Sequence, residues 1–171
     1  IKRCRTKLKK QRDKRIRPFE DSKILTDWNA MMIAALAKAS IVFKRSDWLI
    51  LAENAMTSLK KLLYLDGAWC HAWRADIVQP IKLLEDYALI IQAEIQLYAA
   101  TNKLSYLQDA EYDLAQSYRF FLDGSVFYQT ARNNQATLVK NIPVIDNALP
   151  SGNGVMALNL IQLHLITAKR D

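Results

Sequence analysis

Three short polar segments hold most of the side chains in this sequence that could do chemistry. They span residues 21–29, 84–88 and 146–153, and they combine carboxylates, amides and hydroxyls with aromatic rings. A sugar has polar edges and apolar ring faces, so this mixture suits a sugar-like ligand. Paired carboxylates could also act on a glycosidic bond if they lay about 5–10 Å apart.

The strongest candidates for acid–base chemistry are the adjacent carboxylates Glu85 and Asp86, with Asp21 or Asp146 as a partner from another segment. A structural interpretation stays open for each of them. Carboxylates in a first helical turn favour the helix dipole, which would explain Glu85 and Asp86. Asp146 could instead hold the turn that precedes Ser151, a residue suited to cap a helix.

Histidine and cysteine are scarce in this sequence. His71 is the best general-base candidate by residue type, whereas His164 lies within an apolar stretch and is expected in the core. Cys4 and Cys70 are isolated, and neither has a His at metal-ligand spacing. We therefore expect no metal site, no cofactor and no disulfide framework, and a reducing cytoplasm is the default location.

The candidates for ligand contact are aromatic or polar. Trp28, Trp73 and Tyr87 could stack on a sugar ring, but ordinary packing explains aromatic side chains equally well. The polar candidates for ligand binding are Asp21, Asn29, Arg74, Ser151 and Asn153.

Hydrophobic periodicity predicts an all-α chain. The expected helices span 2–15, 26–43, 46–64, 84–100, 105–122 and 151–168, with Thr26 or Asp27 capping the second. Residues 68–74 and 126–130 are typical of short strands or extended loops, and 131–150 is irregular.

Buried and amphipathic helices alternate along the chain. The helices at 26–43, 84–100 and 151–168 are apolar all round, whereas those at 46–64 and 105–122 have a single apolar stripe. This alternation predicts helical hairpins in an inner and an outer layer, with the basic first helix as outer partner of 26–43. Inner helices would then run parallel, so the three polar segments would line one end of a shared cavity.

The net charge of +7 is concentrated at the beginning of the chain. Residues 1–17 hold ten Lys and Arg against one Asp (+9), while the remainder holds fourteen bases and sixteen acids (−2). We therefore separate a basic helical arm, 1–17, from a helical-hairpin domain, 18–171. The arm is expected to face solvent or a partner; nucleic acid is a poor fit because no aromatic side chain is interleaved. No apolar run is long enough to span a membrane, and the start at Ile1 suggests a fragment.

Several motifs carry a resemblance to a known family. They are Arg5-x-Lys7-Leu8, Lys23-Ile24-Leu25-Thr26-x-Trp28-Asn29, Trp73-Arg74, Leu84-Glu85-Asp86-Tyr87-Ala88 and Asp146-x-Ala148-x-Pro150-Ser151-Gly152-Asn153. In their order and spacing the chain resembles the C-terminal helical part of the thioredoxin-domain-containing proteins related to spermatogenesis-associated protein 20. The resemblance implies a fragment of an (α/α) toroid of the six-hairpin glycosidase type, like N-acylglucosamine 2-epimerases, with short β-hairpin-like connections.

The resemblance also shapes the expected function. It implies a cavity for a sugar-like ligand and carbohydrate metabolism, or alternatively a non-catalytic scaffold that works with an upstream thioredoxin-like domain. Ser22 replaces one of two adjacent Asp residues usual in the family, and Ala30 replaces a Gly. Two widely separated His residues argue against epimerase activity in this fragment. A partial toroid should also leave an apolar flank, covered by self-association or by further chain.

Overall fold

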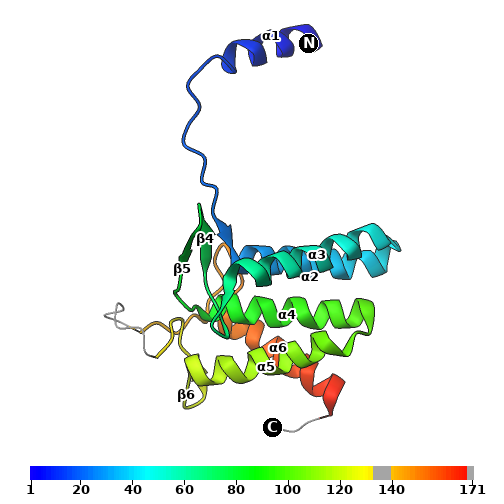
Figure 1. Cartoon of the computed structure of the whole chain (residues 1–171), viewed down its shortest axis with the longest axis vertical. Coiled ribbons are helices and arrows are strands. Elements are labelled where there is room, and N and C mark those ends of the chain that lie inside the picture. Colours follow the sequence, from blue (N-terminus) through cyan, green and yellow to red (C-terminus); the bar gives the residue numbers. More distant parts are fainter. Residues whose placement is uncertain (133–139, 169–171) are drawn as a thin grey trace.

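The computed structural model describes residues 1–132 and 140–168, and six helices dominate this part of the chain (Figure 1). They are α1 (Lys2–Arg12), α2 (Thr26–Phe43), α3 (Ser46–Leu63), α4 (Leu84–Thr101), α5 (Leu104–Phe121) and α6 (Gly152–Thr167). The predicted all-α class is confirmed, and most helix boundaries lie within a residue or two of those expected. Of the segment predicted to be irregular, residues 133–139 lie outside the described residues.

The helices α2 to α6 form the two layers that the periodicity predicts. Helix α4 packs against α2, α5 and α6, and eleven of its 18 residues are buried. Helix α2 contacts α4 through a face of small side chains that includes Ala30, Ala34 and Ala37, so the two backbones lie close together. The amphipathic helices α3 and α5 pack against α2 and α4, respectively, and form the outer layer (Figure 1).

Helix α1 does not take the place expected for it. None of its residues is buried, and it stands apart from the other helices at the end of an extended segment (Figure 1). The prediction that it packs as the outer partner of α2 is therefore wrong. The physical reason is its composition, because Cys4 and Leu8 are its only apolar side chains and cannot form a buried stripe.

Short antiparallel strands connect the helices at one end of the layers. Strands β1 (Ile24–Leu25), β4 (Ala72–Arg74) and β5 (Ile77–Gln79) form a three-stranded sheet in the order β1-β4-β5. Two hairpins pair β2 (Tyr64–Leu65) with β3 (Ala68–Trp69) and β6 (Leu122–Asp123) with β7 (Val126–Phe127). The extended segments expected at 68–74 and 126–130 are thus observed as strands, and β1 leads directly into α2.

The inner helices run parallel with their N-termini together (Figure 1), since Gly152 at the start of α6 lies against Leu84 at the start of α4 and two hydrogen bonds join the helices. The Asp27 N–H at the start of α2 donates to Asp86 Oδ1 in the first turn of α4, at 3.1 Å. Asn159 of α6 donates from Nδ2 to the Ala88 carbonyl oxygen of α4, at 2.7 Å. The polar segments at 21–29, 84–88 and 146–153 therefore lie at the same end of the inner layer, as predicted.

The start of α6 depends on a glycine. A Cβ atom at Gly152 would lie 2.9 Å from both Cγ and Cδ2 of Leu84, closer than real Cβ contacts allow. Leu84 is fully buried, so it has little room to move.

We expect Gly152→Ala to destabilise the protein by about 1–3 kcal/mol, because overpacking forces side chains or backbone to shift. Urea unfolding of both proteins measures this change. In a Leu84→Ala background the added methyl should cost less, since the obstructing side chain is gone. Equal costs in the two backgrounds would show that the close approach is not the cause.

A second set of polar side chains, buried at Asp113 and Glu94 and partly exposed at Lys60 and Asp109, lies between α3, α4 and α5, away from the polar segments. Trp69 Nε1 donates to Asp113 Oδ2 at 2.7 Å, and Lys60 pairs with Asp109 at 2.9 Å. Glu94 is 1% exposed, and among the described residues its Oε2 has no hydrogen-bond partner. Burial raises the pKa of Asp113 to about 6 and raises the pKa of Glu94 well above its ordinary value.

A carboxyl whose folded-state pKa is raised binds its proton more tightly in the folded state than in the unfolded one. Its contribution to stability is complete below the unfolded pKa near 3.8 and is lost as the pH rises through about 6. Asp113→Asn keeps an acceptor for Trp69 and removes the titration. We expect this variant to gain up to about 3 kcal/mol relative to wild type between pH 4 and pH 7. Urea unfolding across this range tests the expectation, with the exposed Asp76→Asn as control; parallel pH profiles for wild type and Asp113→Asn would contradict it.

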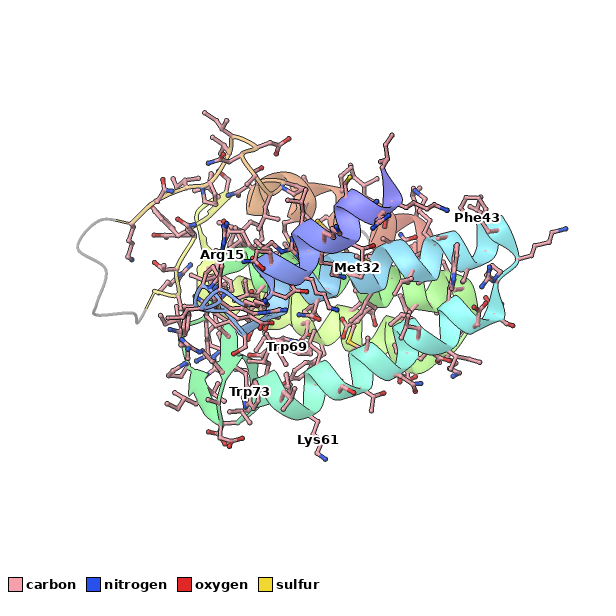
Figure 2. The ribbon with its side chains drawn as sticks, turned by 90° about the horizontal axis from the view of Figure 1, so that it is seen from above. Arg15, Met32, Phe43, Lys61, Trp69 and Trp73 are labelled. Carbon is pink, nitrogen blue, oxygen red and sulfur yellow. The ribbon has the colours of Figure 1, made fainter. Side chains whose placement is uncertain are left out.

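Apolar side chains remain exposed on the inner helices. Met32 on α2 is 60% exposed, and Leu158, Ile161 and Leu165 on α6 are 53%, 57% and 76% exposed. Met32 and Phe43 can be followed along α2 in Figure 2. The apolar flank expected for a partial toroid is therefore present, while its occupant stays a prediction. Within the described residues, no helix has the length and apolar character needed to cross a membrane.

Candidate functional site

A cavity of about 530 Å³ lies at the N-terminal end of the inner helices. Two carboxylates face it, Asp27 from α2 and Glu85 from α4, and the segment 141–151 forms its other wall. The polar lining residues are Asp27, Glu85, Gln129, Asn141, Asn147 and Ser151. The cavity thus brings together all three polar segments identified in the sequence.

Asp27 is the functional candidate that sequence analysis missed, because it was interpreted only as a helix cap. Helix α2 begins at Thr26 without a cap from its own side chains. Asp27 instead accepts the Trp28 N–H on Oδ1 at 2.7 Å, and its own N–H is bound by Asp86. Its position within a polar segment was the available signal, but the partner that fixes it lies 59 residues away.

The buried Asp86 and the partly exposed His71 form a pair next to Asp27. His71 Nδ1 lies 3.1 Å from Oδ2 and 3.2 Å from Oδ1 of Asp86. Asp86 is 0% exposed. Burial raises the pKa of Asp86 to about 7, against the effect of the His71 hydrogen bond. The hydrogen bond to Asp86 raises the pKa of His71, although burial opposes it. The hydrogen bond therefore favours the charged form of both groups, against the burial that opposes it.

The backbone around His71 is fixed from both sides. The Thr26 N–H donates to the His71 carbonyl oxygen at 3.0 Å, and the His71 N–H donates to the Ile81 carbonyl oxygen at 3.0 Å. The Thr26 hydroxyl donates to the Cys70 carbonyl oxygen. These bonds place a histidine from the connection between β3 and β4 against the first turns of α2 and α4.

Glu85 is half-buried and lines the cavity directly. Burial raises its pKa, and the negative charge of Asp27 acts in the same direction. Its Oε2 is buried without a hydrogen-bond partner among the described residues. Helix α4 has Leu83 as its N-cap residue, which makes no side-chain cap. Glu85 and Asp86 lie in the first turn of α4, where carboxylates suit the helix dipole, and Asp86 also accepts a backbone N–H at the start of α2.

The third polar segment builds the wall of the cavity. Ser151 caps α6 by accepting the Gly154 N–H on Oγ at 3.1 Å, and its own N–H donates to Asp146 Oδ1 at 2.8 Å. Asn153 donates from Nδ2 to the carbonyl oxygens of Phe127 and Pro143. Ser151 borders the cavity, while Asp146 and Asn153 hold backbone around it. The structure therefore shows the turn-holding contact that the sequence left open for Asp146.

We expect Asp146→Ala to lower the free energy of unfolding by about 1 kcal/mol, because the Ser151 N–H loses its acceptor. Asp146→Asn retains an acceptor oxygen and should stay close to wild type. Thermal or urea unfolding of the three proteins measures the difference. If Asp146→Asn is destabilised as much as Asp146→Ala, the negative charge rather than the hydrogen bond is important.

Seven of the eight sequence-predicted ligand residues are not among those that line the cavity, and Ser151 is the exception. Asp21 is exposed and pairs with Lys23 at 3.2 Å, and Asn29 donates to the Leu25 carbonyl oxygen. Trp73 and Arg74 line a separate pocket of about 450 Å³ on the β4–β5 hairpin. Trp73 is labelled in Figure 2. These residues are not brought together with Glu85.

The aromatic candidates Trp28 and Tyr87 differ in exposure. Trp28 is 59% exposed beside Asp27, so it remains available to a ligand. Tyr87 is 0% exposed, packs edge-on against Phe120 and Phe121, and accepts the Trp69 N–H on its hydroxyl oxygen. Stacking of Tyr87 on a ligand is thus excluded in this structure. The reason is that α4 is buried on every side, so the residue after Asp86 faces the α4–α5 interface.

Paired helices in two layers, with a polar cavity where the inner helices begin, define this chain as a segment of an (α/α) toroid. The cellobiose 2-epimerase of Spirochaeta thermophila shares this fold with a TM-score of 0.68 and 15% identity, over 86% of this chain and 39% of the epimerase chain. A glycoside hydrolase family 76 mannosidase of Bacteroides thetaiotaomicron has a TM-score of 0.66 and 14% identity, over 90% of this chain and 41% of the mannosidase. The predicted fold is confirmed.

Homologues are also found among curated sequences. Spermatogenesis-associated protein 20 of Homo sapiens is 27% identical over 178 aligned residues, and that of Rattus norvegicus is 28% identical. Both alignments cover 96% of this chain but only 23% of the relative, so the chain spans about a quarter of the length of these proteins. The resemblance inferred from the motifs is confirmed. No protein-family model matches the chain.

Proposed function

We propose that this chain contributes a carbohydrate-active site, in which the cavity binds a sugar-like ligand between Asp27 and Glu85. One observation carries the proposal: two carboxylates from the starts of two inner helices line the same cavity. Each comes from a different polar segment, so only the parallel packing of α2 and α4 brings them to one ligand.

The remaining lining suits a polyhydroxylated ligand. Gln129, Asn141 and Asn147 supply amide donors and acceptors, and Ser151 adds a hydroxyl. A carboxylate and an amide can together bind neighbouring hydroxyls of one sugar ring. The solved structures with this fold include a cellobiose 2-epimerase and a mannosidase, which supports a carbohydrate over other polar ligands.

Glycoside cleavage or transfer is the reaction class that this arrangement favours. It requires two carboxyl groups on opposite sides of the scissile bond, one to donate a proton and one to act as base or nucleophile. Asp27 and Glu85 provide the two groups. Asp86 and His71 position Asp27 from behind through the backbone N–H. Epimerisation by a pair of histidines is less suitable, because His71 is the only histidine at this end of the described structure.

Ligand binding by the full-length protein tests the proposal. Calorimetry or saturation-transfer NMR with a panel of neutral mono- and disaccharides should detect binding to wild type. Asp27→Asn and Glu85→Gln preserve size and should weaken binding at least about tenfold, which is about 1.4 kcal/mol. Asp76→Asn, at an exposed turn, is the matched control and should bind as wild type does.

The alternative proposal is a non-catalytic scaffold that works with an upstream thioredoxin-like domain. The exposed apolar residues of α2 and α6 and the exposed basic helix α1 favour it, since both are suited to protein contacts. The same experiment separates the two functions. Absence of sugar binding across the panel, with the two variants altering stability alone, would refute the carbohydrate proposal and favour the scaffold.

A further inference from the structure

Three potential metal ligands from three different elements meet beside the cavity. Asp27 comes from the first turn of α2, His71 from the connection between β3 and β4, and Asp86 from the first turn of α4. One ligand atom from each lies within 4.8 Å of the other two. The separation between His71 Nδ1 and Asp86 Oδ2, 3.1 Å, matches two ligands on neighbouring positions of one metal ion.

Backbone N–H groups engage one oxygen of each carboxylate, and the second oxygen of Asp86 contacts His71 Nδ1, a contact that a cation between the two groups would replace. Asp27 accepts the Trp28 N–H on Oδ1, and Asp86 accepts the Asp27 N–H on Oδ1. These bonds orient the carboxylates as the outer contacts of metal ligands do. Oδ2 of Asp86 points at His71 Nδ1, and the carboxylate of Asp27 also borders the cavity. A cation held here would therefore be accessible to water or to a ligand oxygen.

The charges in this region favour a cation. Asp27 and Asp86 are only 6% and 0% exposed, and the half-buried Glu85 is adjacent. Buried carboxylates are costly unless a positive charge compensates them. Among the groups that act most strongly on Asp86 and Glu85, His71 is the one cationic partner, and it is a single, partly exposed ring. This distinguishes the cluster from a solvated acidic surface.

We propose that Asp27, His71 and Asp86 form a binding site for one divalent cation of the zinc, cobalt or manganese class. One imidazole nitrogen and two carboxylate oxygens are a ligand set that these ions accept. Binding replaces the contact between His71 Nδ1 and Asp86, and a proton carried on Nδ1 leaves to solvent. The remaining coordination positions face the cavity. The proposal does not depend on the identity of the ligand in the cavity.

Cobalt binding to the untagged, metal-stripped full-length protein tests this site directly. We expect one Co²⁺ per chain, with visible absorption bands that Zn²⁺ abolishes by competition. His71→Gln, Asp86→Asn and Asp27→Asn should each weaken the binding at least about tenfold. Asp86→Asn retains an acceptor for the Asp27 N–H, and circular dichroism verifies that each variant is folded.

Two controls make the assignment specific. His164→Gln removes the other histidine of the chain, and Cys70→Ser removes the thiol next to His71; both should bind as wild type does. The proposal would be overturned if the folded wild type showed neither cobalt absorption bands nor heat of Zn²⁺ binding in calorimetry. Unchanged cobalt binding by His71→Gln would overturn it as well. Sugar binding without metal binding would leave the proposed function standing, and metal binding without sugar binding would leave this site standing.

Discussion

The hydrogen bond from the Asp27 N–H to the buried carboxylate of Asp86 is the contact on which the site depends. It joins the first turns of α2 and α4, two helices that are far apart in sequence and parallel in space. The start of a helix exposes unpaired N–H groups, and a carboxylate from the neighbouring helix satisfies one of them. The same carboxylate contacts His71, so one fully buried side chain connects α2 and α4 to the segment between β3 and β4.

Burying the carboxylate of Asp86 costs free energy, and hydrogen-bonding groups from the surrounding elements offset this cost. Desolvation disfavours the ionised carboxyl, while the N–H of Asp27 and the imidazole of His71 stabilise it. This balance requires that β4, α2 and α4 hold fixed relative positions. Thr26 contributes by bonding to the backbone of both Cys70 and His71. The small sheet β1-β4-β5 and the residues next to it therefore hold the N-termini of α2 and α4 in place.

The cavity has two sides: a floor, formed by the first turns of α2 and α4, and a wall of irregular chain. The floor carries Asp27 and Glu85 on helices, where their backbones cannot easily move. The wall, formed by 141–151, is held by side-chain contacts of Asp146 and Asn153. Gly152 lets this wall approach α4 closely, because any larger residue would meet Leu84. Polar residues in the third segment thus act mainly by shaping the cavity.

Much of the architecture follows from local sequence. The all-round apolar character of α2, α4 and α6, against the single stripes of α3 and α5, predicts two layers and a shared end for the polar segments. That inference succeeds because side-chain periodicity is a property of consecutive residues. The prediction that α1 packs against α2 is wrong for a related reason. This basic segment has helical propensity, but Cys4 and Leu8 are its only apolar side chains, so packing would bury little apolar surface.

The partners of individual side chains were decided by tertiary packing alone. Sequence analysis predicted no metal site because no histidine lies at ligand spacing from Cys4 or Cys70, and only the packed structure brings His71 close to Asp27 and Asp86. Tyr87 and Asp86 are neighbours in one motif but face different surroundings, because successive residues of a helix point about 100° apart. Thus the sequence by itself determined the helices, their layers and the end where chemistry is concentrated. Only the packed structure decided which carboxylates face the cavity, since that depends on contacts between residues up to 59 positions apart.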